Sequence, residues 1–301
     1  MASPRSYETR EFIYALVIFL VGLLPLSLIQ ALGWLAGLIV WYVVPGRRIM
    51  ATQAVAHHLE KDGKEAARIA RASFSNSFIS FMEPMKGRDV DHYFVRDRFI
   101  IRDPERWQYL QDTDRPFMNT AAHIGAWEIL AMFGPEAFPD KYKINVFRTT
   151  KDDDMNRAMV HLRTRSTTMY VGHREAASKV SKFLRQPRTV SGMVVDHNTL
   201  LKDAIFLPFL NDTAAVNVGP AMLAVRTKAL VAPSFLIRQD GGRLMLCFEE
   251  ILDTATLSGN IREKIKATAL FYTQAVERIV RQFPEQWHWM HRRWKTRPEG
   301  E

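Results

Sequence analysis

The sequence predicts an α/β protein in which a mixed, largely parallel sheet is flanked by helices and preceded by an N-terminal hydrophobic membrane helix. Two patterns lead to this prediction. Residues 12–44 carry no charged side chain, and beyond residue 82 short strand-like segments alternate with helix-like segments. Such alternation is typical of layered folds built on parallel strands. We therefore expect a membrane anchor in residues 1–48 and one domain in residues 49–301.

The uncharged run is longer than one membrane crossing needs. It covers 33 positions, whereas about 20 apolar residues cross the hydrocarbon core, and Pro25 interrupts it. Two arrangements are open: one tilted or kinked helix that spans the bilayer, or two shorter pieces, Phe12–Leu24 and Leu26–Val44, in or near the membrane face. A cleaved signal peptide fits poorly because the run is too long. We expect the protein to be attached to a membrane.

The charge of the chain indicates its orientation. Of the 301 residues, 41 are Lys or Arg and 32 are Asp or Glu, a net charge of +9. Charges cancel within residues 1–44, so the excess lies beyond them, and Arg47 and Arg48 follow the apolar run. The positive-inside rule then puts the domain on the cytoplasmic side. Anionic lipid fits this tethered basic domain better than nucleic acid, for which no motif is present.

The first part of the expected domain is helical. Apolar side chains recur at helical spacing through residues 50–82, and Asp62-Gly63 interrupts the pattern. Asp240-Gly241-Gly242 predicts a hairpin turn between the last two strand-like segments. Those segments are Arg98–Ile101, Phe117–Ala121, Lys143–Phe147, Thr167–Val171, Thr189–Val195, Ala229–Ile237 and Leu244–Glu249.

Amphipathic segments between these strands predict helices, and the pattern is clearest in the last one. The run Asp152–Asp154 is interpreted as a helix N-terminus, where carboxylates are favoured, and not as a metal site. No repeat or linker divides the body, so we expect one domain. The predicted helices are Trp127–Phe133, Asp152–Arg165, Arg174–Leu184, Gly219–Arg226 and Ile261–Phe283.

The sharpest local feature is a histidine at the end of a strand-like run. Glu128 follows His123 by five positions, and Gly125 lies between them. Residues five apart on a helix point about 140° away from each other, so the two can meet only if His123 lies in the strand-to-helix turn. An imidazole with a carboxylate on its other nitrogen suits a general base. On spacing alone, a structural histidine with Glu128 at the helix dipole is the favoured interpretation.

Several separate motifs together change that interpretation. The chain resembles the late lipid A biosynthesis acyltransferases, which add lauroyl or myristoyl groups to lipopolysaccharide precursors, within the H-x4-D/E glycerolipid acyltransferase superfamily. The resemblance covers nearly the whole chain, and its most specific element is the C-terminal tail. It rests on His123 with Glu128, Phe147-Arg148, Arg163-x-Arg165, Asp196-His197, Phe206–Phe209, Gly219–Ala221 and residues 284–300.

This resemblance implies a glycerolipid acyltransferase-like fold and a reaction. A fatty acyl chain would pass from a thioester on acyl carrier protein to a hydroxyl of a lipid A precursor. His123 would take the proton from that hydroxyl, with Glu128 orienting the imidazole, and no acyl-enzyme nucleophile is needed. Residues 49–301 would be a cytoplasm-facing acyltransferase domain at the bacterial inner membrane, in contact with its lipids.

The resemblance also implies substrate-binding residues. Arg163, with Arg148 and Arg165, would bind phosphate or the developing oxyanion through the guanidinium fork. Asp196 would orient one of these arginines. On the residues alone, each arginine also fits a solvated helix face, and Asp196 fits a residue in the turn after a strand.

The remaining chemistry-bearing residues are assigned more simply. Cys247 is the single cysteine, which excludes an intrachain disulfide and a cysteine-rich metal site. His57-His58 is interpreted as structural, and we expect no metal, no nucleotide cofactor and no nucleic-acid partner. The basic, tryptophan-rich tail around His291 either binds anionic headgroups or supports the active-site end.

Two other functions stay open from the sequence. One is acylation of another membrane lipid, of the mannoside or amino-acid-lipid type. The other is a non-catalytic, membrane-anchored lipid-binding protein. An intact His123 and Glu128 argue against the second alternative.

Overall fold

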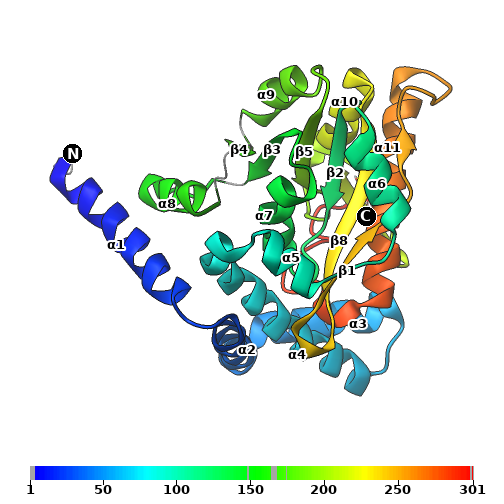
Figure 1. Cartoon of the computed structure of the whole chain (residues 1–301). Helices are drawn as coiled ribbons and strands as arrows, with labels where there is room; N and C mark the ends of the chain where they lie inside the picture. The colour runs from blue at the N-terminus through cyan, green and yellow to red at the C-terminus, as the bar shows by residue number, and fades with distance from the viewer. Residues whose placement is uncertain (1–3, 148, 164–167, 174, 299, 301) are drawn as a thin grey trace.

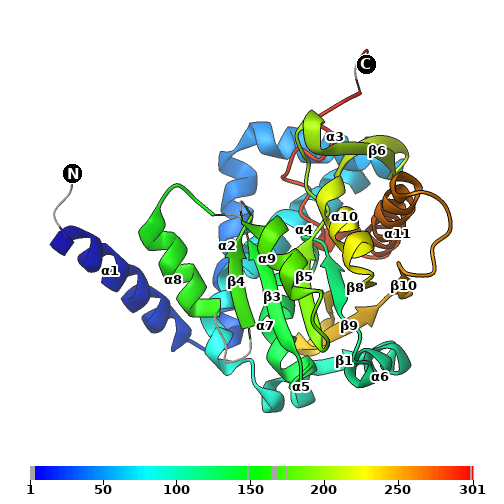
Figure 2. The same cartoon turned by 90° about the horizontal axis from the view of Figure 1, so that it is seen from above.

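The computed structural model describes residues 4–147, 149–163, 168–173, 175–298 and 300. It confirms the predicted fold class: a mixed, largely parallel sheet lies between layers of helices (Figure 1). The N-terminal helices lie at one side of this body (Figures 1 and 2). The division at residue 48 stays a prediction.

The main sheet confirms all seven predicted strands to within one residue at each described end; Thr167, the predicted start of one of them, lies outside the described residues. Parallel pairing prevails, and β9 and the short β10 (Leu252–Asp253) run antiparallel to β8. The η3 turn Asp240–Gly242 joins β8 to β9 as predicted. In spatial order the strands are β1 (Phe99–Ile101), β9 (Leu244–Phe248), β8 (Leu230–Arg238), β2 (Phe117–Ala121), β5 (Thr189–Val194), β3 (Tyr142–Phe147) and β4 (Thr168–Gly172).

The predicted helices are also confirmed, with shifted ends. The expected break at Asp62-Gly63 is a helix boundary, because the Asp62 carboxylate caps the next helix through the N–H groups of Lys64 and Glu65, each at 2.9 Å. The helices of the body are α3 (Pro45–Leu59), α4 (Gly63–Met82), α5 (His92–Arg98), α6 (Pro104–Asp112), α7 (Trp127–Ala137), α8 (Asp153–Arg163), α9 (Ala176–Phe183), α10 (Val218–Thr227) and α11 (Ile261–Gln282). Short helical turns are η1 (Glu83–Asp89), η2 (Leu201–Asp203) and η4 (Pro284–Gln286).

Alternate residues of the central strands face two separate apolar cores. On β2, Phe117 packs with α5, α6 and α7, whereas Met118 packs on the opposite face with α4, α9, α10 and α11. This alternation follows from the two-residue period of a strand. Helices therefore cover both faces of the sheet, as is usual for largely parallel sheets.

A second, two-stranded sheet was not predicted. β6 (Ala204–Phe209) and β7 (Asp212–Asn217) pair in antiparallel register. Their two-residue turn has positive φ at Leu210 (51°) and Asn211 (61°), as a type I′ turn requires. The prediction failed because Leu-Asn is not one of the Asn-Gly or Asp-Gly pairs that signal such a turn.

The apolar N-terminal run forms two helices. α1 (Pro4–Gly22) and α2 (Leu26–Val43) are separated at Pro25, which precedes α2. α2 packs closely against α4: a Cβ atom added to Gly33 would lie 2.7 Å from the Cα atom of Ile79, and one added to Gly37 would lie 2.5 Å from the Cα atom of Ser75. The two helix backbones therefore touch because glycine stands at these positions.

We expect Gly37→Ala to lower the free energy of unfolding by about 1–3 kcal/mol, the usual cost of overpacking. The added Cβ would also lie 2.6 Å from the carbonyl oxygen of Phe74, so backbone atoms would have to move. Gly46→Ala is the matched control, because a Cβ there meets nothing within 4 Å. Chemical unfolding in detergent, followed by circular dichroism, measures both, and equal stability of the two variants would contradict the packing described.

Candidate active site

A tight turn carries the chain from β2 into α7. Gly125 in this turn has φ +59°, and a Cβ atom on it would lie 2.1 Å from the carbonyl oxygen of Leu236. Only glycine fits this position. The turn places His123 just beyond the carboxyl end of β2, the edge at which parallel α/β sheets bind ligands.

The imidazole of His123 is held by a buried carboxylate. His123 Nδ1 lies 2.8 Å from Oδ1 of Asp196, and the main-chain N–H of His123 donates to Oδ2 at 2.9 Å. Asp196 follows β5, the neighbour of β2, so both residues lie at the same edge of the sheet. The indole N–H of Trp287 also donates to Oδ2, at 2.7 Å. The carboxylate thus fixes the imidazole and leaves Nε2 as the ring nitrogen for a substrate.

These contacts set the protonation of the pair. Burial opposes the charge of His123, but the charge and hydrogen bond of Asp196, with a smaller contribution from the charge of Glu128, raise the His123 pKa. Burial would raise the pKa of Asp196, but the charge and hydrogen bond of His123 outweigh it, and the pKa lies below its usual range. Asp196 therefore stays ionised and stabilises the imidazolium form of His123. The His123 side chain is still 33% exposed.

The structure places Glu128 and Asp196 relative to His123. Glu128 was expected to orient His123, and this stays a prediction: Asp196 contacts Nδ1, and the charge of Glu128, in the first turn of α7, contributes to the raised pKa of His123. Asp196 was expected to orient a substrate-binding arginine, but its fully buried carboxylate faces His123 and Trp287. The sequence contains no local signal for this pairing, because Asp196 is 73 residues from His123.

The expected substrate-binding arginines are only partly described. Arg148 and Arg165 lie outside the described residues, and Arg163 is the last residue of α8. The acidic run before α8 is a helix N-terminus, as predicted: the N–H of Met155 donates to Asp152 Oδ1 at 3.0 Å.

The C-terminal segment packs against the turn that carries His123 and against Asp196. Ile124 and Trp287 form an antiparallel bridge, and the N–H of His288 donates to the carbonyl oxygen of His123 at 2.9 Å. His291 Nε2 lies 3.2 Å from the carbonyl oxygen of Asp196. The tail therefore supports the active-site end, one of its two expected roles. Sequence reasoning did not find Trp287 as the partner of Asp196.

Headgroup binding, the other expected role of the tail, does not fit Arg293. Its side chain is buried, and Nη1 donates to the carbonyl oxygen of Ala215 at 2.6 Å. Burial lowers the pKa of Arg293 to about 10. Arg293 is therefore a buried residue that binds the main chain of β7 and is not exposed to lipid headgroups.

A second set of hydrogen bonds joins α4 to the turn between β2 and α7, residues 122–126, which we call the catalytic turn. Ser80 Oγ donates to the carbonyl oxygen of Gly125 at 2.6 Å and accepts from Arg238 Nη2 at 2.6 Å. Arg238 forms a buried ion pair with Glu83, and Gln30 of α2 donates to that carboxylate at 3.1 Å. This chain of polar contacts connects α2 to the catalytic turn.

Aromatic rings surround the exposed edge of His123. The centroid of its ring lies 5.5 Å from that of Trp127 and 6.2 Å from that of His288. Phe81 packs against both of these rings and is 47% exposed. Aromatic rings from α4, α7 and the tail thus lie around the imidazole of His123.

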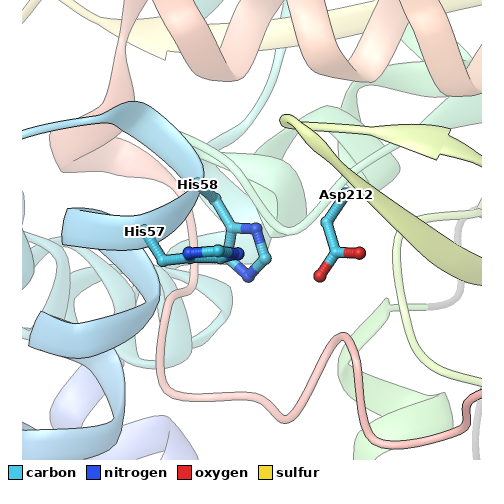
Figure 3. A group of neighbouring side chains, drawn as sticks. All are labelled: His57, His58 and Asp212. Carbon is cyan, nitrogen blue, oxygen red and sulfur yellow. The ribbon is translucent and has the colours of Figure 1, made fainter. Parts of the chain in front are cut away.

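Away from this site, one cluster among the described residues has the donor atoms of a metal site. The ligand atoms of His57, His58 and Asp212 lie within 4.8 Å of one another. Figure 3 shows the two histidines on α3 facing Asp212 at the β6–β7 turn. Arg297, however, donates to both carboxylate oxygens of Asp212, at 3.1 and 3.2 Å. The guanidinium already neutralises this carboxylate, so we assign the cluster to holding the tail.

His58 has a structural role, as the sequence analysis expected. Its ring stacks on Trp294 with centroids 3.4 Å apart, and Nδ1 lies 3.1 Å from the carbonyl oxygen of Leu210. It thus joins α3, the β6–β7 hairpin and the tail.

An imidazole held by a buried carboxylate at the carboxyl edge of a parallel sheet is the arrangement that a general base requires. A family model described as bacterial lipid A biosynthesis acyltransferase matches residues 2–296. The chain belongs to this family, which confirms the resemblance seen in the sequence.

A shorter similarity points the same way. Over 106 residues the chain is 32% identical to the "Lipid A biosynthesis lauroyltransferase" of Escherichia coli (strain K12). The aligned part covers 35% of this chain and 33% of that protein. The chain therefore matches about a third of the length of this relative.

We expect Asp196→Asn to lower the pKa of His123. The substitution removes the negative charge that raises this pKa, and the burial that lowers it remains. NMR of ¹³C-labelled histidine across the pH range measures the shift, with the resonance assigned by a His123→Gln variant. Asp212→Asn is the control, since Asp212 lies with His58 and Arg297. An unchanged pKa in Asp196→Asn would refute the pairing.

We also expect stability to fall as the pH is lowered from 7 to 5. Burial lowers the pKa of His58 and His291 to about 4 and that of His288 to about 3. Because histidine in the unfolded chain titrates near pH 6.5, the unfolded state binds more protons below that pH. Each histidine contributes up to about 1.4 kcal/mol per pH unit. Chemical unfolding at several pH values measures the free energy of unfolding, which should depend less steeply on pH in His58→Phe than in the parent protein. An identical dependence on pH would exclude His58 as a contributor.

Proposed function

We propose that this protein transfers a fatty acyl chain from acyl carrier protein to a hydroxyl group of a lipid A precursor. The proposed site of action is the bacterial inner membrane, with the catalytic domain facing the cytoplasm. Family membership supports acyl transfer and the lipid A precursor. The net charge of +9 supports an acidic carrier protein as donor, because opposite charges favour the encounter. The observation that carries the mechanism is the His123–Asp196 pair.

In this mechanism His123 acts as a general base. Nε2 takes the proton of the acceptor hydroxyl while its oxygen attacks the thioester carbonyl. The tetrahedral intermediate collapses as the C–S bond breaks, and the proton on His123 passes to the departing thiolate. The products are an ester and a free thiol, and no covalent intermediate with the enzyme forms.

The carboxylates have separate tasks in this proposal. Asp196 fixes the tautomer through Nδ1 and stabilises the imidazolium as it forms. Glu128 adds negative charge beside the same ring, in keeping with its contribution to the raised pKa of His123. Arg148, Arg163 and Arg165 are proposed to bind the phosphate groups of the acceptor or the developing oxyanion.

We expect His123→Gln to lower kcat by about 10²–10⁴-fold, the range attributed to general-base catalysis. Purified protein is incubated with acyl carrier protein thioesters of several chain lengths and a tetra-acylated lipid A precursor. Mass spectrometry then measures the product, which is heavier by one acyl group. Glu128→Gln is expected to lose activity as well, because the negative charge beside His123 is removed.

His173→Gln is the matched control, since this histidine is exposed and lies beyond β4. It should keep the activity of the parent protein. Full turnover in His123→Gln would overturn the mechanism. No product with any donor from the folded parent protein would point to another acceptor lipid or to a lipid-binding role.

A further inference from the structure

The surface of α2 is apolar on both of its long faces. A stripe of every fourth residue faces α4 and is buried: Ile29, Gly33, Gly37 and Trp41. The opposite stripe is exposed and is also apolar, with Leu28, Leu32, Leu35, Ile39 and Tyr42 between 40% and 59% exposed. A helix that is apolar all round belongs in a core or in lipid. In this structure α4 covers one face of α2, and the opposite apolar face is suited to contact with lipid.

α2 is the described helix that has the length and composition to cross a membrane, but it is fixed along its length to the domain. Gly33 and Gly37 allow its backbone to touch that of α4. Ser75 Oγ donates to the carbonyl oxygen of Trp34 at 3.1 Å, and Gln30 donates to Glu83. A crossing by α2 would therefore take α4 into the bilayer with it.

α4 is unsuited to the hydrocarbon region. Its N-terminal turns expose Lys64 and Arg68 and leave Glu65 partly exposed. Its inner face is tied to the active site: Ser73 Oγ donates to the carbonyl oxygen of Trp287 at 2.6 Å, and Ser80 Oγ donates to that of Gly125. Sinking α4 would bury exposed charges and part of the catalytic domain, which the hydrocarbon core disfavours.

α1 is too short in its apolar part to cross instead. That part is Phe12–Gly22, about 16 Å of helix, whereas the hydrocarbon core is about 30 Å thick. Its exposed side chains are large and apolar, including Phe12 and Leu20 at 65% and 52% exposed. α1 projects from the body on the same side as α2 (Figures 1 and 2).

We propose that α1 and α2 lie in the plane of one membrane leaflet and that neither crosses the bilayer. The partner of this surface is a bilayer with anionic headgroups, since Arg47, in the first turn of α3, is exposed although it donates to the carbonyl oxygen of Met290, and Arg48 lies 5.9 Å from the Trp41 ring. This inference resolves the two arrangements left open by the sequence. It deepens the proposed function, because α4 contacts both α2 and the catalytic turn.

Depth measurements test this arrangement without any activity assay. A fluorophore is attached to a single cysteine at Leu28, Leu35 or Tyr42 in a Cys247→Ala background, with the protein on phosphatidylethanolamine–phosphatidylglycerol vesicles. Quenchers fixed at known depths in the lipid then locate each label. Ile261→Cys, an exposed apolar position at the start of α11, is the control and should not be quenched.

The two arrangements give different depth profiles. Helices in the plane put all three labels at one depth, about 5–10 Å below the headgroups. A crossing helix puts the label at Leu35 about 10 Å deeper than the other two, because seven residues of helix span that distance. This second profile would overturn the proposal. Labels that none of the lipid-attached quenchers reaches would also overturn the proposal. If the protein is then a dimer in the absence of lipid, the exposed face of α2 belongs to the contact with a second copy of the chain.

Side-specific labelling in cells gives an independent check. A cysteine at Ser6 is treated with a membrane-impermeant maleimide in spheroplasts of a Gram-negative host. Helices in the plane of the cytoplasmic leaflet predict labelling only after lysis, as for Ile261→Cys. Labelling of Ser6→Cys in intact spheroplasts would show a crossing and would contradict the proposal. Both readouts stand even if the protein acylates a different lipid.

Discussion

The buried carboxylate of Asp196 is the constraint on which the rest of the site depends. A buried charge is tolerated only when hydrogen bonds and an opposite charge compensate it. Three N–H groups do so here: the main chain and the ring of His123, and the indole of Trp287. They come from the end of β2 and from the tail, whereas Asp196 follows β5. Distant segments must therefore come together before the histidine has its basic, oriented form.

Close packing holds the same turn from the other side. Gly125 approaches Leu236 so closely that no side chain fits, and its carbonyl oxygen accepts from Ser80 of α4. Its N–H donates to the carbonyl oxygen of Gln286, at 3.1 Å. The position of His123 thus follows from backbone contacts on both sides and does not depend on the histidine side chain.

Local patterns predicted the elements well, and long-range contacts explain the rest. The strands were found because their apolar runs end at turn residues, and α4 begins at the predicted interruption, Asp62-Gly63. His123 was found for a similar reason, since it follows a strand. The role of Asp196 was missed because its partners are 73 and 91 residues away, and no spacing in the sequence encodes that distance. The β6–β7 hairpin was missed because Leu210-Asn211 is an unusual turn pair.

α4 links the two ends of the chain to the chemistry. One of its faces receives α2 through Gly33 and Gly37, and another receives the tail, where Ser73 donates to the carbonyl oxygen of Trp287. Since Trp287 of the tail supplies one of the three N–H groups that compensate Asp196, the site is complete only once this part of the tail has packed. The same helix thus keeps the exposed apolar surface of α2 close to the turn that carries His123. The proposed acyl transfer to an amphiphile would need this proximity, because the reacting hydroxyl is attached to a chain that stays in the leaflet.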